Sequence, residues 1–260
     1  MQRFTDRRII VTGAGSGIGA ATVARLLDED ATVVAYDVSA SGLADAAAAA
    51  DEAGTGKRLT TAVLDVSSEA DVTAAVDAAV TELGGLDVLV NAAAIQRCAH
   101  THEHTLADWN DTLAVNLTGT FLMVRQALPA LLDSGHGVVV NFTSTAATFA
   151  HPYMAAYAAS KGGVLALTHG LALEYSKQGL RAVNIQPGGV ATALAMSTLD
   201  KMPEGYDLGL WAKQTPLLSG TDGGILGEPS AVAAVIAMVA SDDGRFITGT
   251  ELRIDGGAHA

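Results

Sequence analysis

A serine, a tyrosine and a lysine lie within one stretch of the chain and carry side chains suited to proton transfer. Tyr157 follows Ser144 by thirteen residues, and Lys161 follows Tyr157 by four. Because residues four apart share one face of a helix, we expect the Lys161 ammonium beside the phenol, where it stabilises the phenolate. An unperturbed tyrosine has a pKa near ~10 and accepts protons poorly at neutral pH, so it needs such a neighbour.

These groups suit chemistry at an alcohol or carbonyl oxygen. Ser144 follows the apolar run 137–142, which is typical of a buried parallel strand, so its hydroxyl is expected at the sheet edge where ligands bind. No histidine is placed by the sequence to activate Ser144 for ester or peptide cleavage. A Tyr–Lys pair also arises by chance in helices, so this interpretation depends on the rest of the chain. Tyr153 lies one predicted helical turn before Tyr157 without a lysine partner, and it is expected to pack or to form a pocket wall.

A glycine-rich turn near the N-terminus has the context of a dinucleotide-binding loop. It lies between the apolar strand 8–12 and the amphipathic segment 20–27. Glycines there let the backbone turn tightly and approach a diphosphate, whose charge is met by the amides at the helix N-terminus. The predicted cofactor-binding residues of this loop are Gly13, Ser16, Gly17, Ile18 and Gly19.

Asp37 indicates which dinucleotide is bound. It ends the second predicted strand, 31–36, and lies 20 residues after Gly17. A carboxylate at this place accepts hydrogen bonds from the adenosine ribose hydroxyls and repels a 2′-phosphate. Since Val38 and Ser39 carry no positive charge, NAD is favoured over NADP. The alternative is that Asp37 serves only as a helix cap or turn residue.

Other strand ends supply further cofactor-binding candidates. Asp65 follows the third strand, where it either accepts a hydrogen bond from the adenine amino group or caps the next turn. Asn91 is expected to tie the fourth strand to its neighbour, and the small residues 92–94 after it would let the cofactor lie close to the backbone. Thr192 is placed to contact the nicotinamide carboxamide. The remaining candidates are Val66, Pro187, which sets the exit from the sixth strand, Gly188 and Val190.

Strand and helix patterns alternate along the whole chain. Strands are predicted at 8–12, 31–36, 59–64, 86–91, 137–142, 180–185 and 247–255. Helices are predicted at 20–27, 41–53, 68–83, 106–132 and 230–241, with a further helix carrying Tyr157 and Lys161 to about Gln178. This order predicts a doubly wound α/β fold, a seven-stranded parallel sheet with helices on both faces, in one domain over 1–260. The irregular apolar segment 193–227 is expected to be a substrate-binding lid, although its apolar residues would equally suit an oligomer contact.

Composition limits the classes of partner. The 28 acidic and 15 basic residues give a net charge of −13, which repels nucleic acid and anionic membranes. A single cysteine, Cys98, cannot form an internal disulfide, and the N-terminus lacks an apolar signal core. We therefore expect a cytoplasmic protein with no membrane or nucleic-acid partner. With 49% hydrophobic and 17% charged residues, the chain is expected to form a homo-oligomer.

Two polar features need separate interpretation. His100, His102 and His104 alternate on a polar stretch that has no second ligand cluster, so no metal site is predicted. The sequence around Asn116 and Gly119 is poor in helix formers, so a kink is expected in helix 106–132 that frees a backbone carbonyl near Lys161. Asn116 either holds water for a proton relay or is a packing residue.

The motifs together resemble the classical short-chain dehydrogenases/reductases, in order and over nearly the whole chain. The residues that carry the resemblance are Thr12-Gly13, Gly17-Ile18-Gly19, Asp65-Val66, 91–94, Asn116, Ser144, Tyr157, Lys161, Pro187-Gly188 and 254–257. The resemblance implies a Rossmann-like fold in which Tyr157 is the general acid/base and Lys161 lowers its pKa and binds the nicotinamide ribose. It also implies that Ser144 polarises the substrate oxygen and that Asn116 supports a water relay. Ala92 and Ala94 depart from the family, which usually has Asn and Gly at these two positions.

The predicted function is an NAD-dependent oxidoreductase that interconverts a secondary alcohol and a ketone, both small molecules. The alternatives are an NADPH-dependent 3-oxoacyl thioester reductase and a dinucleotide-binding regulatory protein without turnover. A homotetramer is expected from the resemblance, with the long apolar helices and the last strand at the interfaces. The candidates for the substrate pocket wall are Gln96, His151, Tyr153, Met196, Tyr206 and Trp211.

Overall fold

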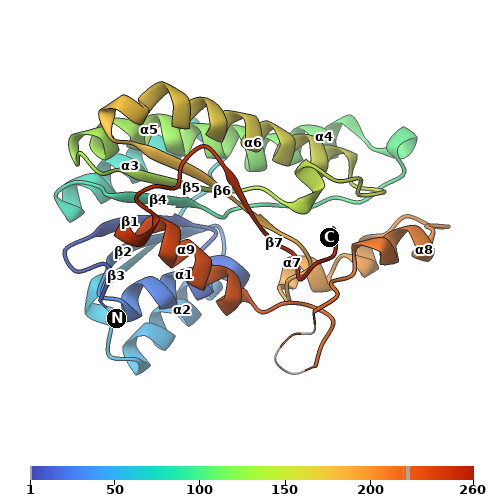
Figure 1. The fold of residues 1–260 in the computed structure, drawn as a ribbon, viewed down its shortest axis with the longest axis horizontal. Helices are drawn as coiled ribbons and strands as arrows, with labels where there is room; N and C mark the ends of the chain where they lie inside the picture. Colours follow the sequence, from blue (N-terminus) through green and yellow to red (C-terminus); the bar gives the residue numbers. More distant parts are fainter. Residues whose placement is uncertain (1, 219, 221–222) are drawn as a thin grey trace.

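The computed structural model, which describes residues 2–218, 220 and 223–260, contains one seven-stranded parallel sheet (Figure 1). The strand order is β3-β2-β1-β4-β5-β6-β7. The strands are β1 (Arg8–Thr12), β2 (Thr32–Asp37), β3 (Leu59–Val63), β4 (Val88–Asn91), β5 (Val138–Phe142), β6 (Arg181–Pro187) and β7 (Glu251–Ile254). The chain reverses direction across the sheet between β1 and β4, which is the doubly wound, Rossmann-like arrangement predicted from the sequence.

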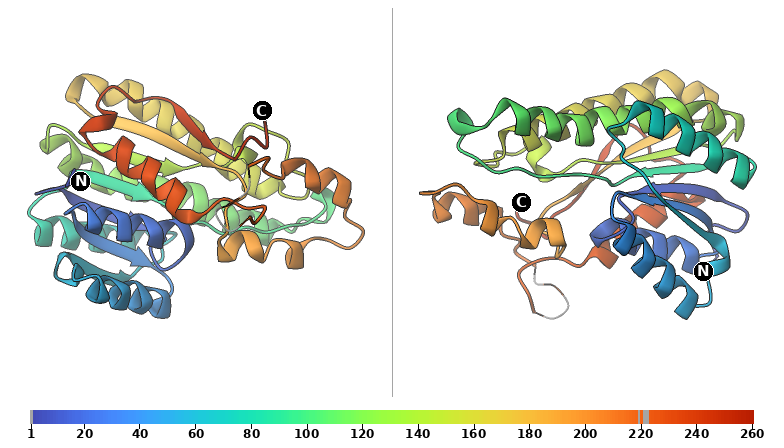
Figure 2. Two further views of the ribbon diagram at one scale, coloured as in Figure 1. Left: turned by 60° about the horizontal axis from the view of Figure 1, so that its bottom comes forward. Right: turned by 180° about the vertical axis from the view of Figure 1, so that it is seen from behind.

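Helices cover both faces of the sheet. The helices are α1 (Gly17–Asp28), α2 (Ala40–Glu52), α3 (Glu69–Leu83), α4 (Leu106–Leu113), α5 (Thr120–Asp133), α6 (Ala155–Tyr175), α7 (Ala193–Met196), α8 (Leu208–Trp211) and α9 (Pro229–Ala240). Figures 1 and 2 show α1, α2 and α9 on one face, α3, α5 and α6 on the other, and α7 with α8 beyond the carboxyl ends of the strands. Among the described helices, none combines the length and the apolar character needed to cross a bilayer.

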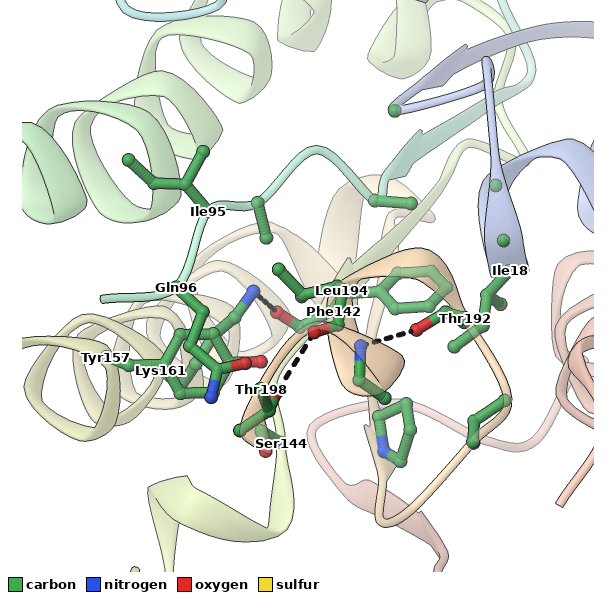
Figure 3. Close-up of a pocket in the computed structure, with 18 of the residues that line it drawn as sticks. Ile18, Ile95, Gln96, Phe142, Ser144, Tyr157, Lys161, Thr192, Leu194 and Thr198 are labelled. Carbon is green, nitrogen blue, oxygen red and sulfur yellow. Dashed lines mark hydrogen bonds between the residues drawn. The ribbon is translucent and has the colours of Figure 1, made fainter. Parts of the chain in front are cut away.

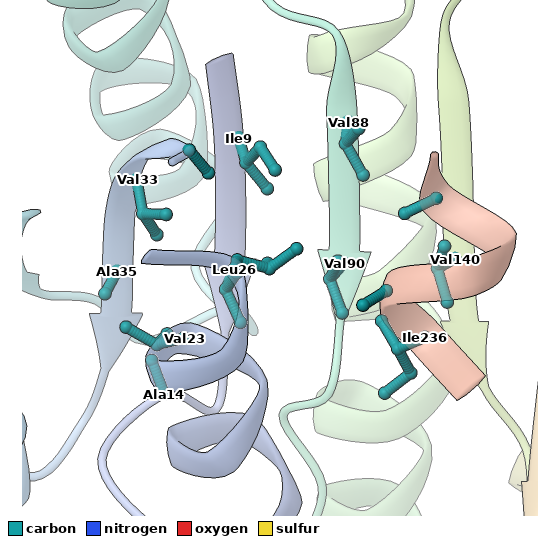
Figure 4. Close-up of a cluster of buried hydrophobic side chains, with 14 of the residues drawn as sticks. Ile9, Ala14, Val23, Leu26, Val33, Ala35, Val88, Val90, Val140 and Ile236 are labelled. Carbon is teal, nitrogen blue, oxygen red and sulfur yellow. The ribbon is translucent and has the colours of Figure 1, made fainter. Parts of the chain in front are cut away.

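Alternating side chains of the central strands build a separate core on each face. Ile9 of β1 packs on the side of α1 and α9, whereas Ile10 packs on the side of α3 and α5. Figure 4 shows the first core, in which Leu26 of α1 and Ile236 of α9 meet the strand valines. Both side chains are fully buried, and each contributes about 1.5–3 kcal/mol relative to an exposed position. The sheet is therefore a rigid platform for the groups at its edge.

The predicted helix 106–132 is interrupted, as its sequence indicated. It consists of α4, a π-helical turn over Ala114–Gly119, and α5. A Cβ on Gly119 would lie 2.8 Å from the Val66 side chain, so glycine allows the helix to pack closely against the segment after β3. The helix is therefore interrupted for two reasons. Weak helix formers occur there, and the turn packs closely against another element.

Several predicted boundaries differ from the structure by two or more residues, and two of the differences have a clear physical reason. Helix α6 begins at Ala155, so Tyr153 precedes the helix, with a left-handed φ of 68° that a bulky residue adopts only under constraint. Strand β7 begins at Glu251 and not at Ile247. Gly249, with a φ of 62°, turns the chain two residues before β7, and the regular ladder with β6 starts at Glu251.

The predicted lid, 193–227, projects past the strand ends and contains α7 and α8 (Figure 2). Its base is closed by backbone hydrogen bonds from Ala191 N to Gly227 O, 2.8 Å, and from Gly227 N to Gly189 O, 2.9 Å. Its two ends are therefore adjacent, as in a compact loop. Three of its residues, Ser219, Thr221 and Asp222, lie outside the described residues.

Candidate active site

A cavity of about 750 Å³ lies between the carboxyl ends of the strands and the lid. Open α/β sheets bind ligands at this edge, next to the point where the strand order reverses. Nearly all residues predicted to bind the cofactor or to act in catalysis line it. They are Gly13, Ser16, Gly17, Ile18, Gly19, Asp37, Asp65, Val66, Ser144, Tyr157, Lys161, Pro187, Gly188, Val190 and Thr192.

The glycine loop has the shape of a diphosphate cradle. Gly13 has a φ of 67°, and a Cβ there would lie 2.6 Å from the Ala92 carbonyl carbon. A Cβ on Gly19 would collide with the Gly13 carbonyl oxygen. The side chain of Ser16, the N-cap of α1, makes no capping hydrogen bond, so no side chain caps the first-turn amides from this position. Exposed amides at a helix N-terminus bind anions, so the residues present fit the diphosphate of a dinucleotide.

Asp37 both holds the loop and faces the cavity. Its Oδ2 accepts a hydrogen bond from Gly15 N at 2.9 Å, and its Oδ1 accepts one from Ser39 N at 2.8 Å. The bond from Ser39 N shows that Asp37 also acts as a turn residue, which was the alternative interpretation of this position. Asp65 is similar, because its Oδ1 accepts from Ser67 N at 2.9 Å while the residue lines the cavity. Turn capping and ligand binding are therefore compatible at both positions.

Tyr157 and Lys161 lie one turn apart on α6 and are almost fully buried (Figure 3). Lys161 Nζ donates a hydrogen bond to Phe142 O at 2.8 Å and lies 5.7 Å from the centre of the Tyr157 ring. Ser144 lies beyond the end of β5, where its hydroxyl accepts a hydrogen bond from Ala146 N and also hydrogen-bonds the Tyr157 phenol. The three predicted catalytic side chains thus meet at one wall of the cavity.

The electrostatics of this wall differ from the sequence-based expectation. Burial raises the pKa of Tyr157 above its usual value, because the phenolate loses solvation, and the hydrogen bond with Ser144 opposes that rise. Burial lowers the pKa of Lys161 to about 8. The predicted lowering of the Tyr157 pKa is therefore wrong for this structure. Its Lys161 partner instead directs Nζ to the Phe142 carbonyl.

Asn116 lies behind the cavity wall and not in it. Its Oδ1 accepts a hydrogen bond from Ile95 N at 2.8 Å, and its Nδ2 donates to Ile95 O at 2.9 Å and to Ser160 Oγ at 3.0 Å. Its carbonyl accepts from Thr120 Oγ1. The predicted free carbonyl beside Lys161 is not observed, since Lys161 bonds to Phe142. Asn116 was predicted either to hold water or to be a packing residue. Its side-chain hydrogen bonds to Ile95 and Ser160 are those of a structural residue.

Asn91 also lies outside the lining of the cavity. Its Nδ2 donates to Asn141 Oδ1 at 2.8 Å, so it joins β4 to β5. The predicted tie between neighbouring strands is confirmed. Asn91 therefore supports the sheet edge from which Ala92 and Ala93 face the cavity.

The predicted substrate wall is partly assembled as expected. Gln96, His151, Met196 and Trp211 line the cavity, whereas Tyr153 and Tyr206 do not. The Tyr153 hydroxyl accepts a hydrogen bond from Asp207 N, at the start of α8, and its ring packs edge-on against Tyr206. Tyr153 therefore anchors the lid and forms no pocket wall.

Several lining residues were missed by sequence reasoning. They are Met154, Leu194, Thr198, Leu199, Gln214, Thr215, Pro216, Ile225 and Leu226. Most belong to the lid, whose short helices carry no periodic signal. Gln214 follows Trp211 by three residues, a spacing that places both on one side of a tight helical turn and is the one local clue available.

The histidines at 100, 102 and 104 are held by other contacts. The His100 ring packs edge-on against Tyr153, and its Nε2 lies 3.1 Å from Glu204 O. Within the described part of the chain, no three His, Cys, Asp or Glu side chains are grouped closely enough to hold a metal ion. The absence of a metal site remains a prediction.

Comparison with known proteins identifies the architecture of this site. A family model described as short chain dehydrogenase matches residues 7–203. The chain is 39% identical to the D-threitol dehydrogenase of Mycolicibacterium smegmatis, over 98% of this chain and 94% of that protein. The crystal structure of levodione reductase superimposes with a TM-score of 0.88 at 34% identity, covering 98% of each chain. Carveol dehydrogenase from Mycobacterium avium, solved in complex with NAD, gives a TM-score of 0.87 at 25% identity over 99% of each chain.

Proposed function

Since the chain belongs to the short-chain dehydrogenase/reductase family, we propose that it is an NAD-dependent oxidoreductase that interconverts a small secondary alcohol and a ketone. One observation carries the proposal. A single cavity extends from the glycine loop to a wall where Ser144, Tyr157 and Lys161 converge. A dinucleotide site continuous with a proton-transfer site is the arrangement that hydride chemistry at a carbinol carbon needs.

Each of the three residues has a role that follows from its position. Tyr157 is the general acid/base, taking the hydroxyl proton in oxidation and returning it in reduction. Ser144 donates a hydrogen bond to the same substrate oxygen, which stabilises the charge that develops there. Lys161, whose buried Nζ is held by the Phe142 carbonyl beside the Tyr157 ring, is proposed to bind the ribose of the cofactor. A bound nicotinamide dinucleotide supplies the hydride acceptor or donor.

The preference for NAD rests on charge. The residues proposed to hold the cofactor are the glycine loop for the diphosphate, Asp37 for the adenosine ribose, Asp65 for the adenine, and Thr192 for the nicotinamide carboxamide. Among the described residues that line the cavity, Lys161 is the one lysine or arginine, and it lies at the catalytic wall. A 2′-phosphate beside Asp37 would meet a carboxylate and no cation. Carveol dehydrogenase, a structural neighbour, is known in complex with NAD, which agrees with this proposal.

The decisive experiment combines a coenzyme comparison with one substitution. Purified protein assayed on a panel of small secondary alcohols should give a higher kcat/KM with NAD than with NADP. On a working substrate, Tyr157→Phe should lower kcat by about 10²–10⁴-fold, because the general acid/base is lost. Tyr175→Phe, the same change at the far end of α6, is the matched control and should leave turnover unchanged. Wild-type turnover by Tyr157→Phe would reject the mechanism.

The two alternative functions are separated by the same assay. A higher kcat/KM with NADPH and a 3-oxoacyl thioester would favour the reductase. Tight NADH binding without oxidation of any alcohol would favour a regulatory protein. The proposed homotetramer is supported by apolar side chains exposed on the long helices and before β7, at Phe121, Leu173 and Phe246.

A further inference from the structure

Gln96 presents an unpaired hydrogen-bond acceptor at the catalytic wall. The residue is only 6% exposed and lines the cavity. Its Nε2 lies 3.3 Å from Met154 Sδ and 3.7 Å from Cys98 Sγ, two weak acceptors that orient the amide. Its Oε1 accepts no hydrogen bond within the described part of the chain and is not one of the fully buried unpaired polar atoms, so it is open to the cavity. Figure 3 shows the Gln96 amide among the side chains of Tyr157, Lys161 and Ser144.

The position of Gln96 is fixed relative to Tyr157 by two sets of contacts. The preceding residue, Ile95, is bound through both its backbone groups to the Asn116 amide, which also donates to Ser160. Ser160 in turn donates to the carbonyl of Tyr157 at 2.7 Å. On the cavity side, Met154 contacts the Gln96 amide and packs with Tyr157 in one buried cluster. The Gln96 acceptor is therefore preorganised with respect to the reacting centre.

The surroundings of Gln96 suit a neutral guest. The nearby lining is mostly apolar, with Met154, Met196 and Trp211, and His151 is neutral at pH 7 because burial lowers its pKa to about 4. The two carboxylates of the described lining, Asp37 and Asp65, belong to the ends of β2 and β3. At a strand spacing of ~4.8 Å, β2 lies roughly 14 Å from β5, which precedes Ser144. Apart from Lys161, no described lining residue offers a cation for a carboxylate or phosphate group.

We propose that Gln96 determines substrate specificity by accepting a hydrogen bond from a second hydroxyl group of the substrate. The preferred substrates are then small uncharged diols and polyols, and the corresponding hydroxyketones. A mono-alcohol that displaces solvent from the cavity would leave Oε1 without a hydrogen-bond donor, which costs binding energy. A second oxygen without a proton would gain nothing from Oε1, since both atoms are acceptors. This inference rests on the proposed alcohol–ketone function.

The test uses substrates that differ at one position. Wild-type enzyme is assayed with butane-2,3-diol, butan-2-ol and 3-methoxybutan-2-ol. The kcat/KM for the diol should exceed that for the mono-alcohol by about tenfold or more. The methoxy compound keeps the oxygen but lacks its proton, so it should lose the advantage of the diol. These three measurements need no variant and do not depend on how a substitution folds.

A variant assigns the effect to Gln96. Gln96→Leu should lower the ratio of kcat/KM for the diol to kcat/KM for butan-2-ol by about 10–100-fold, because only the diol loses a hydrogen bond. Turnover of butan-2-ol reports that the variant is folded. Gln126→Leu, the same substitution at a glutamine that bonds Asp77 on the surface, should preserve the ratio between the two substrates.

The outcomes separate this inference from the function on which it rests. Oxidation of butan-2-ol with no preference for the diol, or an equal loss on both substrates in Gln96→Leu, would overturn the role of Gln96 and leave the proposed function standing. A methoxy compound as good as the diol would also overturn it. No oxidation of any of the three alcohols with either coenzyme, nor of the wider alcohol panel, would overturn both.

Discussion

The ionisable residues at the catalytic wall are tuned mainly by burial. Tyr157 and Lys161 lie together in a desolvated site, and desolvation penalises the charged form of each, so the pKa of the phenol rises and that of the amine falls to about 8. A lysine with this pKa is mostly protonated at pH 7. The amine loses its charge as the pH rises above about 8.

The depressed pKa of Lys161 predicts a specific pH dependence of stability. Below pH 8 the amine is charged in both the folded and the unfolded chain, and its desolvation cost is fully present. Between pH 8 and the unfolded value of 10.5, only the unfolded chain keeps the proton, so stability rises with pH through this residue. The free energy of unfolding of wild type relative to Lys161→Met should increase by about 2–3 kcal/mol over this range.

Urea unfolding of both proteins at pH 7.5 and pH 10 measures this change. Both proteins contain Tyr36 and Tyr157, whose pKa values are also raised by burial. Subtracting one free energy of unfolding from the other removes the pH dependence that these two tyrosines contribute. A difference that stays constant between the two pH values would show that the amine is not desolvated.

At the scale of elements, the π-helical turn between α4 and α5 positions the segment after β4 that carries Gln96. It places the Asn116 amide where it pairs with both backbone groups of Ile95 and with Ser160. Three elements are joined in this way: the segment after β4, the π-helical turn, and the turn of α6 that carries Tyr157. A π-helical turn at such a place is common near functional sites.

Removing this junction should cost both stability and activity. Asn116→Ala leaves the two backbone groups of Ile95 unpaired, and we expect a loss of about 2–4 kcal/mol in the free energy of unfolding. The kcat/KM should also fall, because the wall that carries Gln96 loosens. Ser160→Ala removes a single partner of Asn116 and is expected to cost about 1 kcal/mol. Urea titrations and steady-state assays check the order, and equal stabilities of the two variants would contradict it.

A second element-scale feature is the attachment of the lid. Tyr153 adopts a left-handed backbone conformation, and its hydroxyl accepts the amide of Asp207 at the start of α8. Such strain persists only where surrounding contacts determine the conformation. The contact with α8 and the edge-on packing against Tyr206 are those contacts.

At the scale of the whole molecule, apolar surface remains where the proposed tetramer would cover it. Leu173 on α6 is 83% exposed and Phe246, before β7, is fully exposed. These sites lie on the long helices and the last strand region, where the interfaces are expected. Exposed large apolar side chains of this kind are typical of surfaces buried on assembly.

Charge placed on this surface should prevent assembly. Leu173→Glu is expected to shift the protein from tetramer to a smaller species in sedimentation velocity, because a carboxylate would be buried without a partner. Val63→Glu is the matched control, since Val63 is 61% exposed on the edge strand β3, away from both expected interfaces. A wild-type protein that sediments as a stable monomer would reject the proposed tetramer.

What the sequence determined by itself follows from short-range rules. The glycine loop, the strand ends at Asp37 and Asp65, and the Tyr157–Lys161 spacing were readable because strand-to-helix turns and helix periodicity involve neighbouring residues. The same rules indicated the interruption near Asn116 and the alternation of strands and helices along the chain.

Only the tertiary structure decided which groups face one another and how deeply they are buried. The role of Tyr153 in holding the lid, the bonds of Asn116 to Ile95, and the unpaired oxygen of Gln96 depend on contacts between distant segments. The direction of the Tyr157 pKa likewise depends on burial, which spacing does not encode. Local patterns specify elements, whereas packing between elements sets solvation and hydrogen-bond partners.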